Sequence, residues 1–178
     1  MSFIHKLGGA ALAVGILASP AMPAMAAEVT IGIRSEPSSM DPYFHNLGPN
    51  NGMIGHVFER LIDFDSNQQI IPGLATSWKP ISDTVWEFKL RPNVKFTDGS
   101  DFTADDVIYS FERADSYEGG NSSFRIYTKG KTVKKVDDLT VHIETPEPYP
   151  LMPNDLTAVM IMSSEAKGTG ELGKNKGV

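Results

Sequence analysis

The chain contains no cysteine among its 178 residues. A chain without cysteine cannot form disulfide bonds, hold a metal ion through thiolates or use a thiol as a nucleophile. The sequence also lacks an excess of basic residues, because 16 Lys and Arg against 22 Asp and Glu give a formal net charge of −6 at pH 7. Nucleic-acid-binding domains usually concentrate positive charge, so this balance argues against a nucleic-acid partner.

No apolar run reaches the roughly 20 residues that a membrane-spanning helix needs. Residues 7–17 (LGGAALAVGIL) form a shorter apolar run, which follows Lys6 and precedes the sequence Ala24-Met25-Ala26. A basic start, a short apolar run and a small-x-small cleavage site are the features of a secretory signal peptide. Residues 1–26 are therefore predicted to direct export, with cleavage after Ala26 or Ala27.

Residues 27–166 mix patterns typical of short strands and short helices. Residues 167–178 form a polar, low-complexity end. Alternating or apolar segments bounded by turn residues predict strands. The expected strands cover residues 28–33, 84–90, 94–96 and 158–162, with hairpins over 61–71 and 132–144 and a short apolar turn at 74–78.

Two helices are predicted from apolar residues at helical spacing. Asn50 or Asn51 is expected to cap the first, and Thr103 with Asp106 forms a T-x-x-D capping box before the second. The first helix would bury Met53, Ile54, Val57, Phe58 and Leu61, and the second Val107, Ile108 and Phe111.

No pattern of residues predicts catalysis. Residues 63–67 (DFDSN) have the opening spacing of a calcium loop, but Gln68 replaces the glycine and Leu74 replaces the bidentate glutamate that such a loop needs. Asp105 and Asp106 fall in the first turn of a predicted helix, where carboxylates are expected for electrostatic reasons alone. No histidines have the spacing of metal ligands, so neither an enzyme, a metal site nor a cofactor is predicted.

A long segment, residues 34–49, has no hydrophobic period and is rich in Pro, Ser and Asn. Such segments are uncommon inside compact domains unless they have a function. Aromatic residues in this and later loops could line a groove for an extended peptide or could belong to the core. They are Tyr43, Phe44, Tyr117, Phe124 and Tyr127.

Six colinear blocks between about Val29 and Ser164 resemble the family 5 extracellular solute-binding proteins, which are the dipeptide, oligopeptide and nickel-binding components of ABC importers. The blocks are residues 36–42 (EPSSMDP), 57–61 (VFERL), 72–78 (PGLATSW), 86–91 (WEFKLR), 95–99 (KFTDG) and 102–107 (FTADDV). Residues 109–111 (YSF) and the hairpin over 136–146 continue the resemblance in the same order.

The resemblance implies an α/β fold of the type II periplasmic-binding-protein kind, which has two lobes in the full-length family. The chain would then supply only the N-terminal part of the family domain. The implied function is that of a periplasmic, monomeric substrate-binding component that delivers peptides or similar small solutes to an ABC permease in the inner membrane.

The resemblance also implies where ligand contacts fall. The segment after the Asp-Pro pair contacts ligand in peptide-binding relatives, and it corresponds here to His45, Asn46, Leu47 and Gly48. A tyrosine beyond the capped helix contacts peptide in some relatives, and Tyr117 or Phe124 could fill that position. The family also serves nickel chelates, heme, sugars and opines, so the ligand stays open. The sequence is also compatible with a secreted hydrolase or with a non-functional fragment.

Overall fold

A computed structural model of the chain describes residues 29–33, 35–116 and 124–166. The predicted signal peptide, Tyr117 and the polar end lie outside these residues. The chain divides into two units, residues 1–32 and 33–178, and every helix and strand described below belongs to the second. Within the described part, no helix is both long enough and apolar enough to cross a membrane.

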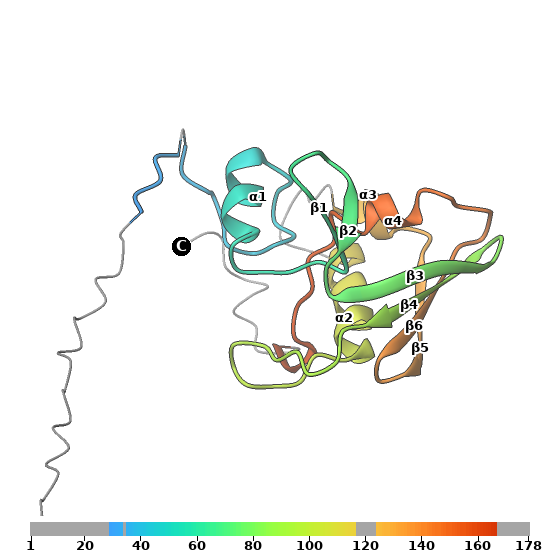
Figure 1. The fold of residues 1–178 in the computed structure, drawn as a ribbon. Helices are drawn as coiled ribbons and strands as arrows, with labels where there is room; N and C mark the ends of the chain where they lie inside the picture. The colour runs from blue at the N-terminus through green and yellow to red at the C-terminus, as the bar shows by residue number, and fades with distance from the viewer. Residues whose placement is uncertain (1–28, 34, 117–123, 167–178) are drawn as a thin grey trace, which may run out of the picture. The chain divides into compact units, whose positions relative to one another are not determined.

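Four strands form an antiparallel sheet in the order β3-β4-β6-β5 (Figure 1). Their bounds are Ala75–Ser82 for β3, Val85–Leu90 for β4, Thr132–Asp137 for β5 and Thr140–Glu144 for β6. The register pairs Trp78 with Phe88 and Phe88 with Val141, so these side chains share one face. The predicted strand over 84–90 and the predicted hairpin over 132–144 are confirmed.

The opposite face of the sheet is charged. A cross-strand row runs through Lys79, Glu87, His142 and Lys134, one residue from each strand. The carboxylate oxygens of Glu87 lie 3.5 Å from Lys79 Nζ, 3.6 Å from Lys89 Nζ and 3.4 Å from His142 Nε2. The hydrogen bond with His142, followed by the two lysines, holds the pKa of Glu87 below its ordinary value. This face is therefore the solvent face, and the fold's core lies on the other.

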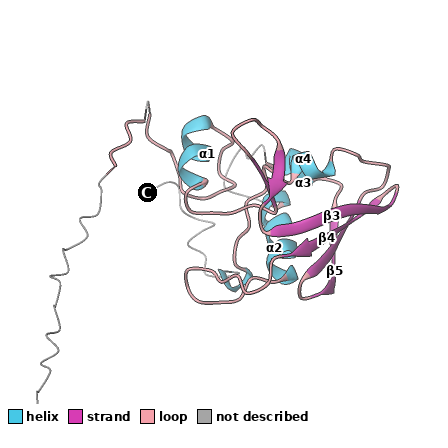
Figure 2. Cartoon of the chain, viewed as in Figure 1, coloured by secondary structure: helices cyan, strands magenta, loops and turns pink. Residues whose placement is uncertain are grey.

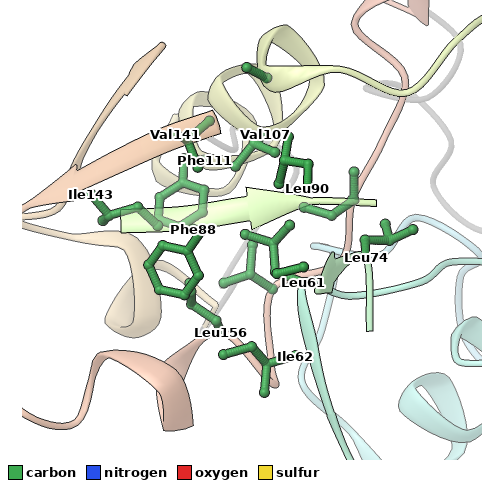
Figure 3. Packing of buried hydrophobic residues seen from close by; sticks show 14 of the residues in the cluster. Leu61, Ile62, Leu74, Phe88, Leu90, Val107, Phe111, Val141, Ile143 and Leu156 are labelled. Atoms are coloured by element: carbon green, nitrogen blue, oxygen red, sulfur yellow. The ribbon is translucent and has the colours of Figure 1, made fainter. Parts of the chain in front are cut away.

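Helix α2 (Ala104–Asp115) covers the apolar face of the sheet. The predicted capping box is present: Thr103 N donates to Asp106 Oδ2 at 2.7 Å, and Thr103 Oγ1 accepts from Asp105 N at 3.3 Å. The helix places Val107 and Phe111 against the strands (Figure 3). The predicted start of this helix is confirmed, and so is its core face at Val107 and Phe111, whereas Ile108 is half-buried and lies outside the core cluster.

A single large cluster of buried apolar residues joins these elements. It combines side chains of the sheet and α2 with others from segments before and after them in the sequence, and Figure 3 shows several of them pointing together. The largest wholly buried members include Leu61, Ile62, Phe88, Val107, Val141, Ile143, Met152 and Leu156.

A separate two-stranded hairpin consists of β1 (Ile62–Phe64) and β2 (Ile70–Pro72). Asp65 Oδ1 accepts hydrogen bonds from the backbone N–H groups of Asn67 and Gln69, both at 2.8 Å. The carboxylate is thus used to build the turn, and the prediction of a plain hairpin turn is confirmed. Among the residues the structure describes, no three of His, Cys, Asp and Glu gather where they could hold a metal ion.

Several strand predictions were wrong. The segment 74–78, expected as a turn, is the start of β3, which continues to Ser82. Pro80 is tolerated there because β3 is an edge strand with a register shift after Pro80. Residues 94–96 and 158–162 each make only one isolated bridge, Lys95 with Asp101 and Arg60 with Met160. Asp98 and Gly99 form a turn after the first of these segments, with Gly99 at a φ of +92°.

The first predicted strand, residues 28–33, is also absent from its described part, residues 29–33. Its apolar side chains Val29, Ile31 and Ile33 are exposed. Alternation of β-branched residues favours a strand only where a partner strand supplies hydrogen bonds and a face to pack on. Neither is found among the described residues.

Helix α1 (Gly48–Ile54) differs from its prediction at both ends. It begins after Leu47 without a side-chain cap, with proline in its first turn, a position that proline favours. The amide of Asn50 is instead bound to Ser38, whose N–H donates to Asn50 Oδ1 at 3.1 Å. The helix ends at Ile54, and Val57, expected on its buried side, is 57% exposed.

The remaining elements are short. They are α3 (Arg125–Thr128), α4 (Met152–Asp155) and the 3₁₀ helix η1 (Ser164–Ala166). Much of the chain around them is loop, as Figure 2 shows. These loops, together with α1, form the part of the molecule that contains the candidate site.

Candidate functional site

A cavity of about 440 Å³ lies beside the predicted ligand-contacting segment. Three kinds of side chain line it, and they come from segments far apart in the sequence. The amides are Asn46, Asn51 and Asn154, the charged groups are Arg60 and Asp155, and the aromatic residues are Phe64, Phe124 and Tyr127. A hollow with aromatic walls and a few polar groups is the usual form of a small-molecule site.

The irregular segment before the cavity is held from inside the protein by polar contacts. Arg113 on α2 donates to Asp41 at 2.6 Å, and the Asp41 side chain is only 1% exposed. The other Asp41 oxygen accepts from Tyr43 N at 2.9 Å. Burial raises the pKa of Asp41, although the Tyr43 N–H and Arg113 both oppose this rise. The segment is thereby fixed to α2 close to the point where it reaches the cavity.

Tyr43 fixes the same segment to a third part of the chain. Its hydroxyl donates a hydrogen bond to the carbonyl of Met160, and the side chain is wholly buried. Burial raises the pKa of Tyr43 far above its ordinary value. The Tyr43 ring meets Phe124 edge-on, with ring centroids 5.8 Å apart. Phe124 is only 2% exposed, so these two aromatic residues belong to the core.

Asn46 is the residue of the predicted ligand-contacting segment that the structure brings to the cavity, and Phe124, the alternative to Tyr117, also lines it. Asn46 Oδ1 accepts from Asn51 Nδ2 at 2.6 Å, and Asn46 Nδ2 lies 3.5 Å from the hydroxyl of Tyr127. The three residues come from the irregular segment, from α1 and from α3. Together they form one polar side of the cavity, so Asn46 is held in place by groups that also face the cavity.

The other predicted residues lie differently. The His45 ring is half-buried against Phe44, with centroids 4.2 Å apart. Leu47 and Gly48 are exposed and do not line the cavity. Leu47 N donates to His45 O at 2.9 Å, and Leu47 O accepts from Asn51 N at 2.8 Å, so both backbone groups of Leu47 are already bonded. Tyr117 lies outside the described residues.

Residues 149–160 supply another side of the cavity, which no sequence pattern indicated. Asp155 Oδ2 accepts from Lys131 Nζ at 2.7 Å and from the Tyr149 hydroxyl at 2.8 Å. The hydrogen bond to Asp155, with burial, raises the pKa of Tyr149. The Lys131 side chain is 4% exposed and lies 4.4 Å from the centre of the Tyr149 ring. The charge of Asp155 is therefore balanced by a buried cation.

Two buried side-chain atoms have no hydrogen-bond partner among the described residues, and both belong to residues that line the cavity. They are Asn51 Oδ1 and Arg60 Nε. Buried polar atoms are normally paired, and unpaired ones are frequently found at functional sites. No pattern in the sequence marked Arg60, Asn51 or Asp155, because their proximity depends on the tertiary fold. Arg60 belongs to residues 57–61, one of the six blocks that resemble the family, but that resemblance assigned it no role in binding.

A second hollow, of about 310 Å³, lies between the turn at 94–98 and residues 161–163. Its walls are mainly apolar, and they include Val57, Phe58, Phe96, Phe102, Ile161 and Met162. Its lining also includes the charged residues Glu59, Lys95 and Asp98, but none of the four residues of the predicted ligand-contacting segment. The cavity at Asn46 is therefore the stronger candidate site.

Comparison with known families gives a match over residues 69–177, to the family model described as bacterial extracellular solute-binding proteins, family 5 Middle. Among characterised proteins, the glutathione-binding protein GsiB of Pectobacterium atrosepticum is 32% identical over 159 residues. That alignment covers 87% of this chain and 30% of GsiB. The periplasmic murein peptide-binding protein MppA of Escherichia coli is 38% identical over 86 residues, or 48% of this chain and 16% of MppA.

Solved structures match the fold as well. The structure of the E. coli murein tripeptide binding protein MppA aligns with a TM-score of 0.70 and 27% identity, covering 78% of this chain and 31% of that one. NikZ from Campylobacter jejuni, in complex with Ni(L-His), aligns with a TM-score of 0.68 and 27% identity, covering 79% and 28%. The chain thus spans less than a third of the length of each of these relatives. The α/β fold is that of part of a type II periplasmic binding protein.

Proposed function

We propose that this chain, which belongs to the family 5 bacterial extracellular solute-binding proteins, forms part of a substrate-binding component of an ABC importer. Its ligand is a peptide or a similar small solute, bound at the cavity that Asn46 and Tyr127 line. The main observation behind the proposal is that Asn46, from the segment expected to contact ligand, lines a cavity with aromatic walls and three asparagine amides.

The composition of the cavity suits a peptide. Peptide groups offer both hydrogen-bond donors and acceptors, and Asn side chains provide both as well. Aromatic walls such as Tyr127 and Phe64 provide apolar area for side chains. Among the described residues that line the cavity, no nucleophile is paired with a general base, so binding and release, rather than catalysis, is the proposed role. Export through residues 1–26 would place the protein in the periplasm, where it would transfer its ligand to a permease.

A nickel chelate is the second candidate ligand, because NikZ with Ni(L-His) is among the structural relatives. A chelate that brings its own ligands needs few metal-binding residues from the protein. The two candidates differ in what they need from the cavity. A peptide needs amide partners along its backbone, whereas a compact chelate needs a fitted pocket around one complex.

The test is ligand-induced stabilisation of the full-length protein that carries this chain, freed of bound ligand before measurement. Peptides of two to four residues, glutathione and nickel–histidine are added separately, and the unfolding temperature is recorded. Because a ligand at 100 times its Kd stabilises the folded state by about 2.7 kcal/mol, binding gives a clear upward shift. A shift with nickel–histidine and none with peptides or glutathione would contradict the peptide proposal.

A matched pair of variants places the site. Asn46→Ala should weaken binding of the stabilising peptide, since Asn46 lines the cavity. Asn67→Ala changes an exposed asparagine in the β1–β2 turn and should leave binding unchanged. If the two variants bound the peptide with equal affinity, the proposal that ligand binds in this cavity would be contradicted.

A further inference from the structure

We infer that Arg60 makes the cavity selective for a peptide-like ligand that carries a side-chain carboxylate in addition to the carboxylate at its C-terminus. The inference rests on the proposed function and specifies its substrate class. Arg60 is the cation on the cavity lining, and its charge is only weakly paired. Its bonds, its burial and the other charges near it all favour a bound anion.

Arg60 has few partners for its donors. Within the described chain it makes one side-chain hydrogen bond, from NH1 to Asp63 Oδ1 at 3.3 Å. A guanidinium carries five N–H donors, and charge-assisted bonds to carboxylates are usually nearer 2.8 Å. The Asp63 side chain is 46% exposed, so water screens its attraction for Arg60. The same carboxylate oxygen also accepts from Phe64 N at 2.9 Å.

Arg60 is nevertheless largely removed from water. Its side chain is 19% exposed, and its Nε is buried without a partner. A buried guanidinium nitrogen without a hydrogen-bond partner is unfavourable in a site that has no other role for it. An anion bound in the cavity would compensate that charge through the remaining donors, because guanidinium geometry matches a carboxylate at two N–H groups.

The other charged group on the lining does not cancel this preference. Asp155 is bonded to the buried ammonium of Lys131 and to the Tyr149 hydroxyl, so its charge is satisfied within the protein. The three asparagine side chains are neutral. Arg60 is therefore the charged group on the lining whose charge is the less well compensated, because its ion-pair partner Asp63 is 46% exposed. A carboxylate is the anionic group that peptides and peptide-like solutes commonly carry.

A pair of isosteric tripeptides, Ala-Glu-Ala and Ala-Gln-Ala, tests the inference by titration calorimetry on the full-length protein. A charged hydrogen bond is worth more than a neutral one by an amount that corresponds to about 10- to 100-fold in affinity. We expect Ala-Glu-Ala to bind more tightly by that factor. Equal affinities would overturn the inference and leave the proposed function intact. Binding of neither tripeptide would overturn the proposed function and the inference with it.

Three variants assign the selectivity to one residue. Arg60→Gln should remove most of the Glu-over-Gln preference, measured as the ratio of the affinities for the two tripeptides. Arg91→Gln is the matched control, because Arg91 is exposed, donates to the carbonyl of Gly73 and does not line the cavity. Asp63→Asn removes the competing carboxylate and should preserve or increase the preference. A preference that survives in Arg60→Gln, or that disappears in Asp63→Asn, would show that another group is responsible.

Discussion

Two regions of the molecule are stabilised in different ways. The sheet region, consisting of β3 to β6 and α2, has regular backbone hydrogen bonds and a contiguous apolar core. The cavity wall, residues 35–61, 124–131 and 149–163, is mostly loop with short helices. There, side-chain hydrogen bonds and ion pairs link segments that are distant in the sequence, such as Asp41 with Arg113 and Lys131 with Asp155.

The difference explains where ligand-binding groups can arise. In the sheet region the polar backbone groups are paired with each other and the side chains of one face are buried, so little remains for a ligand. In the cavity wall the backbone is irregular, and amide, hydroxyl and charged side chains do much of the positioning. Those same groups are of the kind that can bind a peptide, and two of their atoms are left without partners among the described residues.

The largest expected effect comes from the apolar core of the sheet region. Phe88 is wholly buried in β4, so Phe88→Ala should lower the free energy of unfolding by about 3–5 kcal/mol. Ile81→Ala, at a position in β3 that is 46% exposed, should change it by only about 0.5 kcal/mol or less. Urea denaturation followed by circular dichroism measures both. Similar losses for the two variants would contradict the assignment of the core face.

The cavity wall should show a pH-dependent response that depends on the buried Asp41 carboxylate. Arg113→Met removes the cation beside buried Asp41, and breaking a buried pair should cost about 3 kcal/mol at pH 7. The pKa of Asp41, already raised by burial, would rise further without Arg113. A raised carboxyl pKa means that the folded state holds the proton more tightly than the unfolded state. Stability is then lost as pH rises through the folded pKa and regained as pH falls.

The Arg113→Met penalty should therefore be smaller at pH 5 than at pH 7. Urea denaturation of the variant and the wild type at both values measures it. The double variant Arg113→Met with Asp41→Asn lacks the titrating group, so its penalty should be the same at the two values. A penalty for Arg113→Met that grows on acidification would show that the ion pair is not what holds the irregular segment.

The sequence predicted much of the sheet region because its determinants are local. Alternation over residues 84–90 identified β4, and Thr103 with Asp106 identified the start of α2. Strands were wrongly predicted where a short apolar segment has no neighbouring strand to pair with. Residues 158–162 are apolar because they are buried, not because they pair along a strand. Burial and strand formation produce the same short apolar pattern.

The residues of the cavity wall were predicted less well, because long-range packing rather than local sequence brings them together. Only Asn46 among the four segment residues lines the cavity, and it was expected from resemblance rather than from a pattern. Arg60, Asn154 and Asp155 reach the cavity through long-range packing, which no local period encodes. Tyr127 appeared only as one of several loop aromatics. The sequence therefore indicates the segment but not the residues that surround it.

A smaller loss of stability is expected when the N-terminal cap of α2 is removed. Thr103→Ala removes the cap of α2 and should cost about 1 kcal/mol, because one orphan N–H loses its acceptor. Thr103→Ser keeps the hydroxyl and should cost much less. Thr97→Ala, at an exposed position in the neighbouring turn, is the matched control. Chemical denaturation of the three variants gives the comparison, and a loss for Thr97→Ala as large as for Thr103→Ala would argue against the capping interaction.

Among the variants proposed here, Tyr127→Phe in the cavity wall should have the smallest effect on stability and a clear effect on ligand binding. Tyr127→Phe removes one hydroxyl whose contact with Asn46 is long, at 3.5 Å, so unfolding should change by about 0.5 kcal/mol or less. The same hydroxyl lies on the cavity lining, so peptide affinity should fall several-fold. Tyr109→Phe removes a hydroxyl that does not line the cavity and should alter neither quantity strongly. If Tyr127→Phe instead destabilised the fold and left affinity unchanged, Tyr127 would be a structural residue. The separation of the cavity wall, as the binding region, from the sheet region, as the stabilising one, would then fail at this residue.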